Sequence, residues 1–175
     1  MLAVEGGKAL VITDKIIDFR SYHNTTSITW ADCTIRAYLN GEFYNGFSAT
    51  DRTKIADTHN VNKDNQWYGT SGGADTTDKI FLLSLEEVVK YFGDSGQLAN
   101  GNPDDNSYYM IDDQYNNARI ADNSGYSAAW YWWLRSPGDG SDDAAFVDYD
   151  GYVNVNGGIV DYSDNGLRPA LWLNP

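Results

Sequence analysis

An Asp-Gly pair set between two alternating runs, within residues 144–155, constrains the fold of this 175-residue chain more than any other feature. Such a pair is the strongest short-range signal for a β-hairpin. A two-residue loop would mix polar and apolar side chains on both faces of the hairpin. A three-residue loop, residues 149–151 with the glycine left-handed, separates them, and because a one-residue slip turns every side chain over, we expect this register. Its pairs are Val147 with Val153 and Ala145 with Val155.

The expected register gives the hairpin an apolar and a polar face. The inward positions, which include one after the hairpin, are Val147, Val153, Val155 and Val160. The opposite face carries Phe146, Asp148, Tyr152 and Asn154. Residues 156–158 should turn the chain into a third strand at 159–160, and an exposed loop should follow at 161–165. Proline at position 169 confines the last strand, 167–173, to a sheet edge or to its own first residues.

The rest of the chain predicts a mixture of helices and strands. Three Ser/Thr-x-x-acid patterns predict helix starts. They lie at residues 29–32, 48–51 and 84–87, and the helices should run to about 40–41, through 55 and through 92. Further strands are expected at 2–5, 8–12, 79–83 and 130–134. A long loop layer with one strand near 108–111 should fill residues 93–128, and the chain length suits a single domain, 1–175. The first strand begins directly after Met1, which predicts a longer native protein.

Charge and composition exclude several classes of function. The net charge is −13, and residues 92–175 contain three arginines and thirteen aspartates but no lysine. Such a chain offers no basic face for nucleic acid or an anionic membrane, and it lacks the roughly 20 apolar residues that span a bilayer. Cys33, the one cysteine, excludes an intrachain disulfide and a zinc site of several thiolates. We expect it to be a buried structural thiol in the first helix.

No pattern for catalysis or for a cofactor emerges. His23 and His59 lie far apart in the sequence, and neither a nucleophile elbow nor a phosphate-binding loop is present, so the chain is expected not to be an enzyme. Five aspartates could in principle hold calcium. They are Asp139, Asp142, Asp143, Asp148 and Asp150. Gly151 follows two positions too early for an EF-hand loop, and solvated turn acids are the plainer interpretation, so we expect function without calcium or any other cofactor.

Residues 139–166 have the composition of a binding surface. Twenty of these 28 residues are Asp, Gly, Ser, Tyr or Asn, and none is Thr, Lys, Glu or Gln. Turn-rich β structure alone explains Gly, Asn and Asp, but not several tyrosines without a threonine. Tyrosine gives rigid contact area and the small polar residues give adaptable hydrogen bonds. The predicted ligand-binding residues are Asp142, Asp143, Asp148, Tyr149, Asp150, Tyr152, Asn154, Asn156, Asp161, Tyr162, Ser163, Asp164 and Asn165.

Two motifs carry a resemblance to a known family. They are Trp-Trp-Leu-Arg-Ser-Pro-Gly at 132–138 and Gly-Leu-Arg-Pro-Ala-Leu-Trp-Leu at 166–173. With the segments at 29–40 and 79–84, they resemble a bacterial family of unknown function with a C-type-lectin-like fold, known for variable proteins of diversity-generating retroelements. The resemblance implies an α+β domain with mixed or antiparallel sheets, two main helices and long loops. It also implies that the motif side chains are scaffold, and that residues 2–5 pair with 171–173.

The same resemblance implies a function. In such systems mutated template adenines convert asparagine codons to those of Asp, Tyr, Ser, Gly or His, and all of these but His occur here. The segment at about 130–170 would then be a variable surface for a macromolecular ligand, a protein or a glycan. The alternative is a non-diversified module of a bacterial cell surface or phage particle, with a structural, carbohydrate-binding or protein-binding role. A monomer is slightly favoured as the oligomeric state. Formylglycine-generating enzymes share the fold, but their copper site needs paired cysteines.

Overall fold

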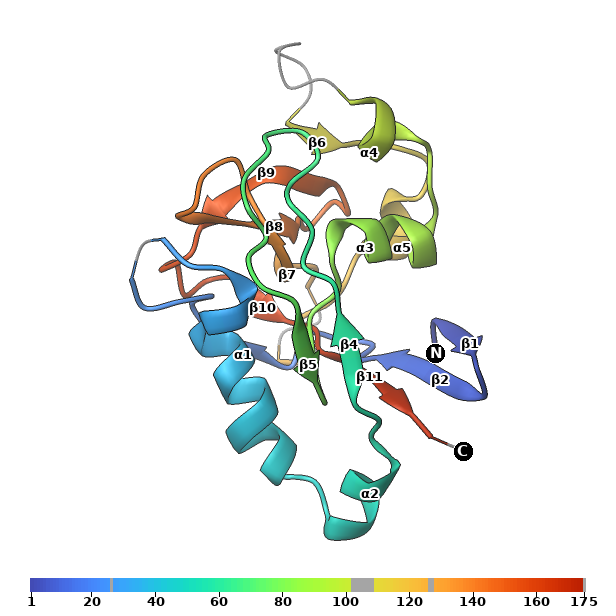
Figure 1. The fold of residues 1–175 in the computed structure, drawn as a ribbon. Coiled ribbons are helices and arrows are strands. Elements are labelled where there is room, and N and C mark those ends of the chain that lie inside the picture. Colours follow the sequence, from blue (N-terminus) through green and yellow to red (C-terminus); the bar gives the residue numbers. More distant parts are fainter. Residues whose placement is uncertain (26, 102–108, 126–127, 175) are drawn as a thin grey trace.

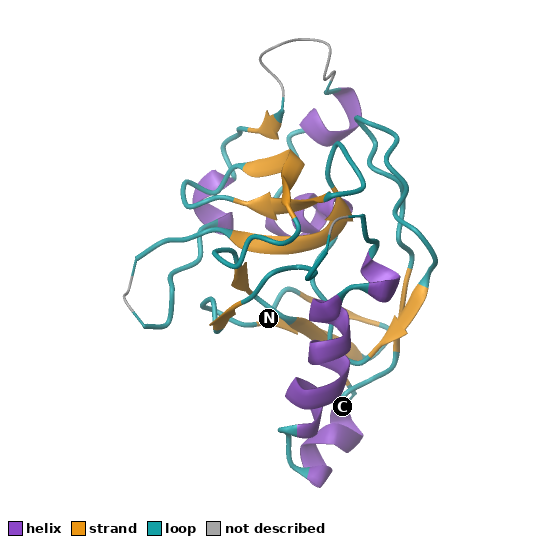
Figure 2. Cartoon of the chain, turned by 90° about the vertical axis from the view of Figure 1, so that its left-hand side faces the viewer, coloured by secondary structure: helices purple, strands orange, loops and turns teal. Residues whose placement is uncertain are grey.

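The chain folds as an α+β structure of three sheets with helices at their sides (Figures 1 and 2). This computed structural model describes residues 1–25, 27–101, 109–125 and 128–174. The strands are β1 (Ala3–Glu5), β2 (Lys8–Ile12), β3 (Asp18–Phe19), β4 (Thr58–Asn60), β5 (Thr76–Asp78), β6 (Met110–Ile111), β7 (Trp132–Pro137), β8 (Asp143–Val147), β9 (Val153–Ile159), β10 (Gly166–Leu167) and β11 (Ala170–Leu173). The helices are η1 (Trp30–Asp32), α1 (Thr34–Tyr38), η2 (Leu39–Phe43), α2 (Ala49–Lys54), α3 (Leu85–Phe92), α4 (Gln97–Asn100) and α5 (Asn116–Arg119).

The largest sheet has six strands in the order β3-β10-β7-β8-β9-β6. β10 runs parallel to β7, and the other neighbours are antiparallel. Every residue of β7 is buried, and Trp132 and Trp133 are completely enclosed. The expected strand at 130–134 is therefore present, beginning at Trp132 and extending further than predicted. The loops that connect the strands of this sheet carry most of the predicted ligand-binding residues.

The chain ends meet in a three-stranded sheet, but not by the predicted pairing. The sheet order is β1-β2-β11, and Leu173 lies opposite Ala9. The expected pairing of residues 2–5 with 171–173 is wrong, because the hairpin partner of β1 also supplies the edge that receives β11. Pro169 interrupts the last segment between β10 and β11, so the expected single strand 167–173 is two short ones.

The first long helix begins later than the sequence pattern predicts. The Thr29 side chain makes no cap hydrogen bond and packs against Gly73 instead. After one 3₁₀ turn, η1, the cap is Cys33, whose Sγ accepts a hydrogen bond from the Arg36 backbone N–H at 3.4 Å. The thiol is buried as expected, but it lies at the helix start rather than inside it.

The predicted end of this helix at residues 40–41 is also wrong, because the helix continues as the π-helical turn η2. The Asn40 side chain donates to the Arg36 carbonyl of its own helix at 3.1 Å and also bonds the segment beside the helix. Its Oδ1 accepts from the Lys79 N–H at 2.7 Å, and its Nδ2 donates to the Ile80 carbonyl at 2.9 Å. Asn40 therefore fastens the helix to residues 79–80 instead of ending it.

The other two predicted helix starts are confirmed. Ser48 caps α2 by accepting from the Asp51 N–H, and Ser84 and Glu87 form a complete capping box at α3. The segment before α3, expected to be a strand at 79–83, is buried but makes only one bridge, between Phe81 and Ala170. Its carbonyls are used by side chains and by β7 rather than by a ladder, so no strand forms.

A buried carboxylate joins the β4-β5 hairpin to the first helix. Asp78 accepts hydrogen bonds from Trp30 Nε1 at 3.0 Å, Thr76 Oγ1 at 2.7 Å and Asn60 Nδ2 at 2.8 Å, and it pairs with Arg36 at 2.6 Å. Burial by itself would raise the pKa of Asp78, but these four donors lower it below the ordinary value. No sequence pattern indicated this network, because its members are distant along the chain.

Residues 93–128 are less irregular than expected. β6 lies within the region where one strand was predicted, although Tyr108 is outside the described residues. Two short helices, α4 and α5, also form there, and Arg119 of α5 is fully buried against Asp113 at 2.9 Å. Within the described ranges, no helix is long and apolar enough to cross a membrane.

Candidate ligand-binding surface

The β8-β9 hairpin has the predicted loop. Val147 lies opposite Val153, and the Asp148 N–H donates to the Tyr152 carbonyl at 3.0 Å, which leaves residues 149–151 as the loop. Gly151 is left-handed, with φ of 83°. The sequence expectation for the loop and for this pair is confirmed, and the hairpin valines are fully buried.

The hairpin departs from the prediction at its far end. Beyond the Phe146–Asn154 pair the ladder shifts, and Ala144 lies opposite Gly158, so the expected Ala145–Val155 pair is wrong. The Val155 N–H donates instead to the Tyr109 carbonyl at 3.0 Å, beside β6. A left-handed Gly157 absorbs the extra residues, so residues 156–158 form a bulge within β9 and not a turn into a third strand.

Asp148 does not point outward as predicted. Its side chain is part of the turn, and its Oδ1 accepts from the N–H groups of Asp150 at 2.9 Å and Tyr152 at 3.1 Å. The residue is only 9% exposed. Burial raises the pKa of Asp148, against the opposing effect of these backbone donors. Asp148 is therefore a structural residue of the loop.

The other predicted residues differ in how much surface they present. The exposed ones are Asp142, Tyr149, Asp150, Asp161, Tyr162, Ser163 and Asp164. The half-buried ones are Asp143, Tyr152, Asn154, Asn156 and Asn165. Asn154 also has a structural contact, because its Oδ1 accepts from the Gly157 N–H at 3.1 Å and holds the bulge. The expectation of an exposed loop at 161–165 is confirmed for all but its half-buried last residue.

The structure divides these residues between two ends of the sheet. At one end, the Val160 N–H bonds the Asp142 carbonyl at 2.9 Å, which brings the loop before β8 to the start of the 161–165 loop. At the other end, the ring of Tyr149 lies 5.4 Å from that of Tyr131, and Tyr131 lies 5.8 Å from Trp130. The two ends are connected by the outer face of β8 and β9.

Carboxylates crowd the first end. The pKa of Asp143 is raised from its ordinary value of 3.8 to about 6 by burial and then by the neighbouring carboxylates of Asp139 and Asp142. Among the described residues, no group of three or more His, Cys, Asp or Glu side chains is placed to hold a metal ion. The independence from calcium remains a prediction.

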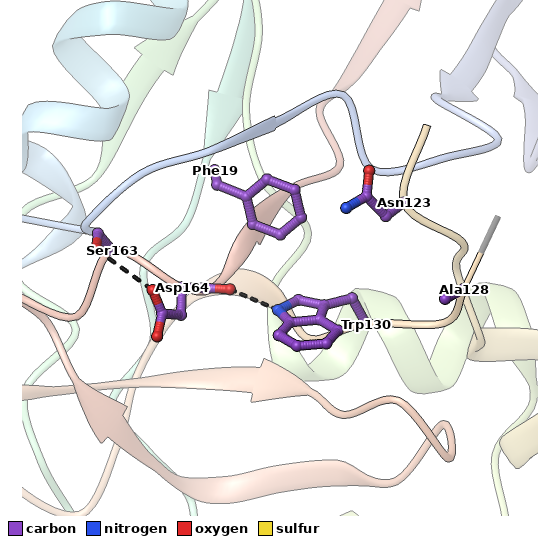
Figure 3. A pocket seen from close by; sticks show the side chains of 6 residues that line it. All are labelled: Phe19, Asn123, Ala128, Trp130, Ser163 and Asp164. Carbon is purple, nitrogen blue, oxygen red and sulfur yellow. Dashed lines mark hydrogen bonds between the residues drawn. The ribbon is translucent and has the colours of Figure 1, made fainter. Parts of the chain in front are cut away.

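The second end contains a cavity that sequence reasoning missed. It has a volume of about 290 Å³ and is lined by Phe19, Asn123, Ala128, Trp130, Ser163 and Asp164. Figure 3 shows the Phe19 and Trp130 rings on opposite sides of it. Only Ser163 and Asp164 were predicted, because Trp130 was assigned to a strand and Phe19 is distant in the sequence. Trp130 instead precedes β7 and is 41% exposed.

A family model describes residues 6–175 as a domain of unknown function, DUF6273. The chain belongs to this family. No curated protein and no solved structure shows a significant match to the chain. The DUF6273 match includes both tryptophan-containing motifs and every strand from β2 to β11.

In this DUF6273 domain, the first motif joins the central sheet to α3. Arg135 forms an ion pair with Glu87, the acidic member of the capping box, and donates to the Leu82 carbonyl at 2.9 Å. The next residue, Ser136, accepts the Leu85 N–H at 3.0 Å. These contacts satisfy backbone groups at the helix start, so the motif residues serve as scaffold, as predicted.

The second DUF6273 motif joins three distant segments. Arg168 donates to the carbonyls of Thr13 at 3.0 Å, Arg119 at 3.3 Å and Asp14 at 3.4 Å. Its guanidinium lies 5.1 Å from the Trp132 ring centroid. Burial lowers the pKa of Arg168 to about 10. Like Arg135, this residue supports the sheet beneath the candidate surface.

Proposed function

We propose that this DUF6273 domain is a ligand-binding module that uses the outer face and loops of the β8-β9 hairpin to bind a macromolecule. The observation that carries the proposal is the separation of roles along one short segment. The hairpin valines are fully enclosed, while Tyr149 and Asp150 in the hairpin loop and Tyr162 in the loop after β9 are exposed. A surface of this kind can change its contacts without changing its core.

The finer form of the proposal is a C-type-lectin-like variable protein of a diversity-generating retroelement. Its support is the sequence resemblance, the scaffold role of both motifs, and chain ends that meet across β2. The structural hydrogen bonds of Asp148 and Asn154 narrow the set of positions that could vary. The variable set would then be the exposed residues of the hairpin loop and the 161–165 loop.

One observation favours the non-diversified alternative. The cavity between Phe19 and Trp130 takes one wall from β3, far outside the segment at about 130–170. A preformed cavity with an aromatic wall from the constant part suits one fixed class of ligand. Both forms of the proposal describe binding without catalysis.

A displayed library tests the proposal. The exposed residues Tyr149, Asp150, Asp161, Tyr162, Ser163 and Asp164 are randomised together, and Asp148 and Asn154 are kept. Members are sorted for protease resistance and then for binding to a panel of purified proteins and glycans. We expect most members to fold, because exposed substitutions change stability by less than about 0.5 kcal/mol. Specific binders should be recovered.

The matched control randomises exposed positions on α2, at the far end of the molecule (Figure 1). Binders should be much rarer from that library. General unfolding of the hairpin library, or equal recovery from the two libraries, would refute the proposed site. For the finer form, the flanking DNA should contain a reverse transcriptase gene and a near-copy of the coding segment that differs only at adenines.

A further inference from the structure

We propose that the cavity between Phe19 and Trp130 binds an arginine side chain of a basic protein ligand, an inference that rests on the proposed binding function and names its ligand chemistry. The cavity, of about 290 Å³, is at the small end for ligand sites and suits one long side chain. One aromatic wall, Phe19, belongs to β3, and the other, Trp130, lies just before β7. Figure 3 shows the two rings facing the same space.

The charge around the cavity points to a cation. Residues 92–175 contain no lysine, and their three arginines, Arg119, Arg135 and Arg168, are at most 6% exposed. The described part of this segment therefore presents carboxylates and no exposed cationic side chain. The carboxylates nearest the candidate surface belong to Asp139, Asp142, Asp150, Asp161 and Asp164. A positively charged ligand would be attracted to this face and a negatively charged one repelled.

Arg20, the cationic residue that follows Phe19 in the sequence, is already paired. Its Nε lies 2.7 Å from the Asp18 carboxylate, and its guanidinium lies 3.6 Å from the Tyr38 ring centroid. Asp18 and Arg20 flank Phe19 in an extended segment, where successive side chains point to opposite sides. Arg20 therefore leaves the face of the Phe19 ring open to a ligand.

The polar groups of the cavity favour a guanidinium over a sugar. Trp130 Nε1 already donates to the Asp164 carbonyl at 2.7 Å, and the Ser163 hydroxyl lies 3.5 Å from the Asp164 carboxylate. The Asn123 side chain adds one amide, whose Oδ1 accepts from the Gly125 N–H at 2.7 Å, so the lining supplies fewer donors than the several hydroxyls of a sugar ring can accept from. A guanidinium needs only acceptors and aromatic faces, and the Asp164 carboxylate and the Phe19 and Trp130 rings supply both.

A neutral apolar side chain is also disfavoured. It would fill the space beside the rings but supply no partner for the exposed Asp164 carboxylate, so it would gain nothing from the negative charge of this face. An arginine covers the same aromatic surface with its alkyl stem and planar head and pairs with the carboxylate. An arginine therefore uses both aromatic rings and the Asp164 carboxylate of the cavity.

The test titrates the full chain with three probes by NMR. The probes are acetyl-Gly-Arg-Gly-amide, the same tripeptide with citrulline, and a panel of methyl glycosides. Citrulline matches arginine in shape but lacks its charge. Binding is followed at the Trp130 indole N–H and at the Ala128 methyl group. We expect the arginine peptide to shift both signals and to bind at least about threefold more tightly than the citrulline peptide.

Two matched variants separate a local contact from the overall field. Asp164→Asn should weaken binding of the arginine peptide until its affinity equals that of the citrulline peptide. Asp142→Asn removes the same charge at the other end of the sheet and should change its affinity by less than about 1.5-fold at 0.15 M salt. Trp130→Leu, followed at Ala128, should weaken binding, whereas Trp130→Phe should largely retain it.

Each other result overturns the inference. These results are equal binding of citrulline and arginine, shifts by a glycoside in place of the peptide, equal effects of the two aspartate variants, and no shift with any probe. None of them decides the proposed function, because the hairpin library can yield binders while this cavity stays empty. Failure of that library, in turn, leaves the titration of the unvaried chain interpretable.

Discussion

At the scale of single residues, several side chains that sequence patterns assigned to solvent or to helix interiors accept hydrogen bonds from backbone N–H groups. Cys33 is the clearest example, because it caps α1 and is buried. Burial raises the pKa of its thiol to about 12, so the reactive thiolate is scarce at neutral pH.

We therefore expect native Cys33 to react with a thiol reagent only as fast as the helix end opens. The urea-unfolded chain should react at the rate of an ordinary cysteine. The measurement is the release of chromophore from an aromatic disulfide reagent, with Cys33→Ser as the blank. Rapid stoichiometric labelling of the folded chain would contradict the buried cap.

Asp143 should make stability depend on pH near neutrality. Its pKa in the folded chain, about 6, is above the ordinary 3.8, so the folded state binds the proton more tightly than the unfolded state. The stabilisation is complete below about pH 4 and is lost as pH rises through 6. Asp143→Asn should therefore raise the melting temperature at pH 7 by about 1–3 °C, a small effect because the residue is partly exposed.

The check is a set of thermal melts between pH 4.5 and 7.5. The variant should lose the decline in stability that Asp143 causes in the wild type between about pH 4.5 and 6. Asp161→Asn, on an exposed loop, is the control and should keep the wild-type profile. An unchanged profile for Asp143→Asn would show that its neighbours do not perturb the carboxyl.

At the scale of elements, the β8-β9 loop depends on one left-handed glycine. A Cβ at Gly151 would lie 2.0 Å from the Asn116 carbonyl oxygen, and its φ of 83° is unfavourable for other residues. Gly151→Ala should cost about 2 kcal/mol or more in the free energy of unfolding, from backbone strain of about 1–2 kcal/mol together with the steric clash.

Gly41→Ala is the matched control for that change. Gly41 lies within η2, and a Cβ there would meet no atom within 4 Å. Alanine should be neutral or stabilising by up to about 1 kcal/mol, since glycine is the weaker helix former. Urea denaturation of both variants measures the difference, and similar destabilisation in the two would remove the argument for a strained loop.

At the scale of the whole molecule, buried arginines connect segments that are far apart in the chain. Arg168 joins the stretch after β2, the end of α5 and the core tryptophan Trp132. Arg168→Lys keeps the charge but cannot reach three carbonyls in different directions. We expect a loss of about 2–4 kcal/mol, because carbonyls are left without donors in the interior.

The comparison is Arg52→Lys on α2, where the guanidinium makes one hydrogen bond, to Asn45 at 3.1 Å. That change should cost less than about 0.5 kcal/mol. Both values come from denaturant melts of the full chain. Equal costs at the two positions would mean that the Arg168 contacts contribute no more than a surface bond.

Local patterns predicted what local physics controls. The three-residue loop, the first two strands and the caps of α2 and α3 were all accessible, because each depends on residues only a few positions apart. The pattern at 29–32 predicted a helix start that does not form there. Threonine can cap a helix, but the Thr29 side chain packs against Gly73 and makes no cap hydrogen bond. The turn-rich composition and the alternation that define the candidate surface are local features of the same kind.

The hairpin, its buried valines and the acidic character of the second half follow from the sequence alone. Alternation, turn chemistry and charge do not depend on the neighbours of a segment. Only the tertiary structure decided that β2 separates β1 from β11, that Tyr109 takes the Val155 N–H and forces the bulge, and that Asp148 faces inward. It also placed Phe19 opposite Trp130 across a cavity. Each of these depends on which distant group satisfies a backbone atom or covers a ring, and the periodicity of a single segment contains no information about that partner.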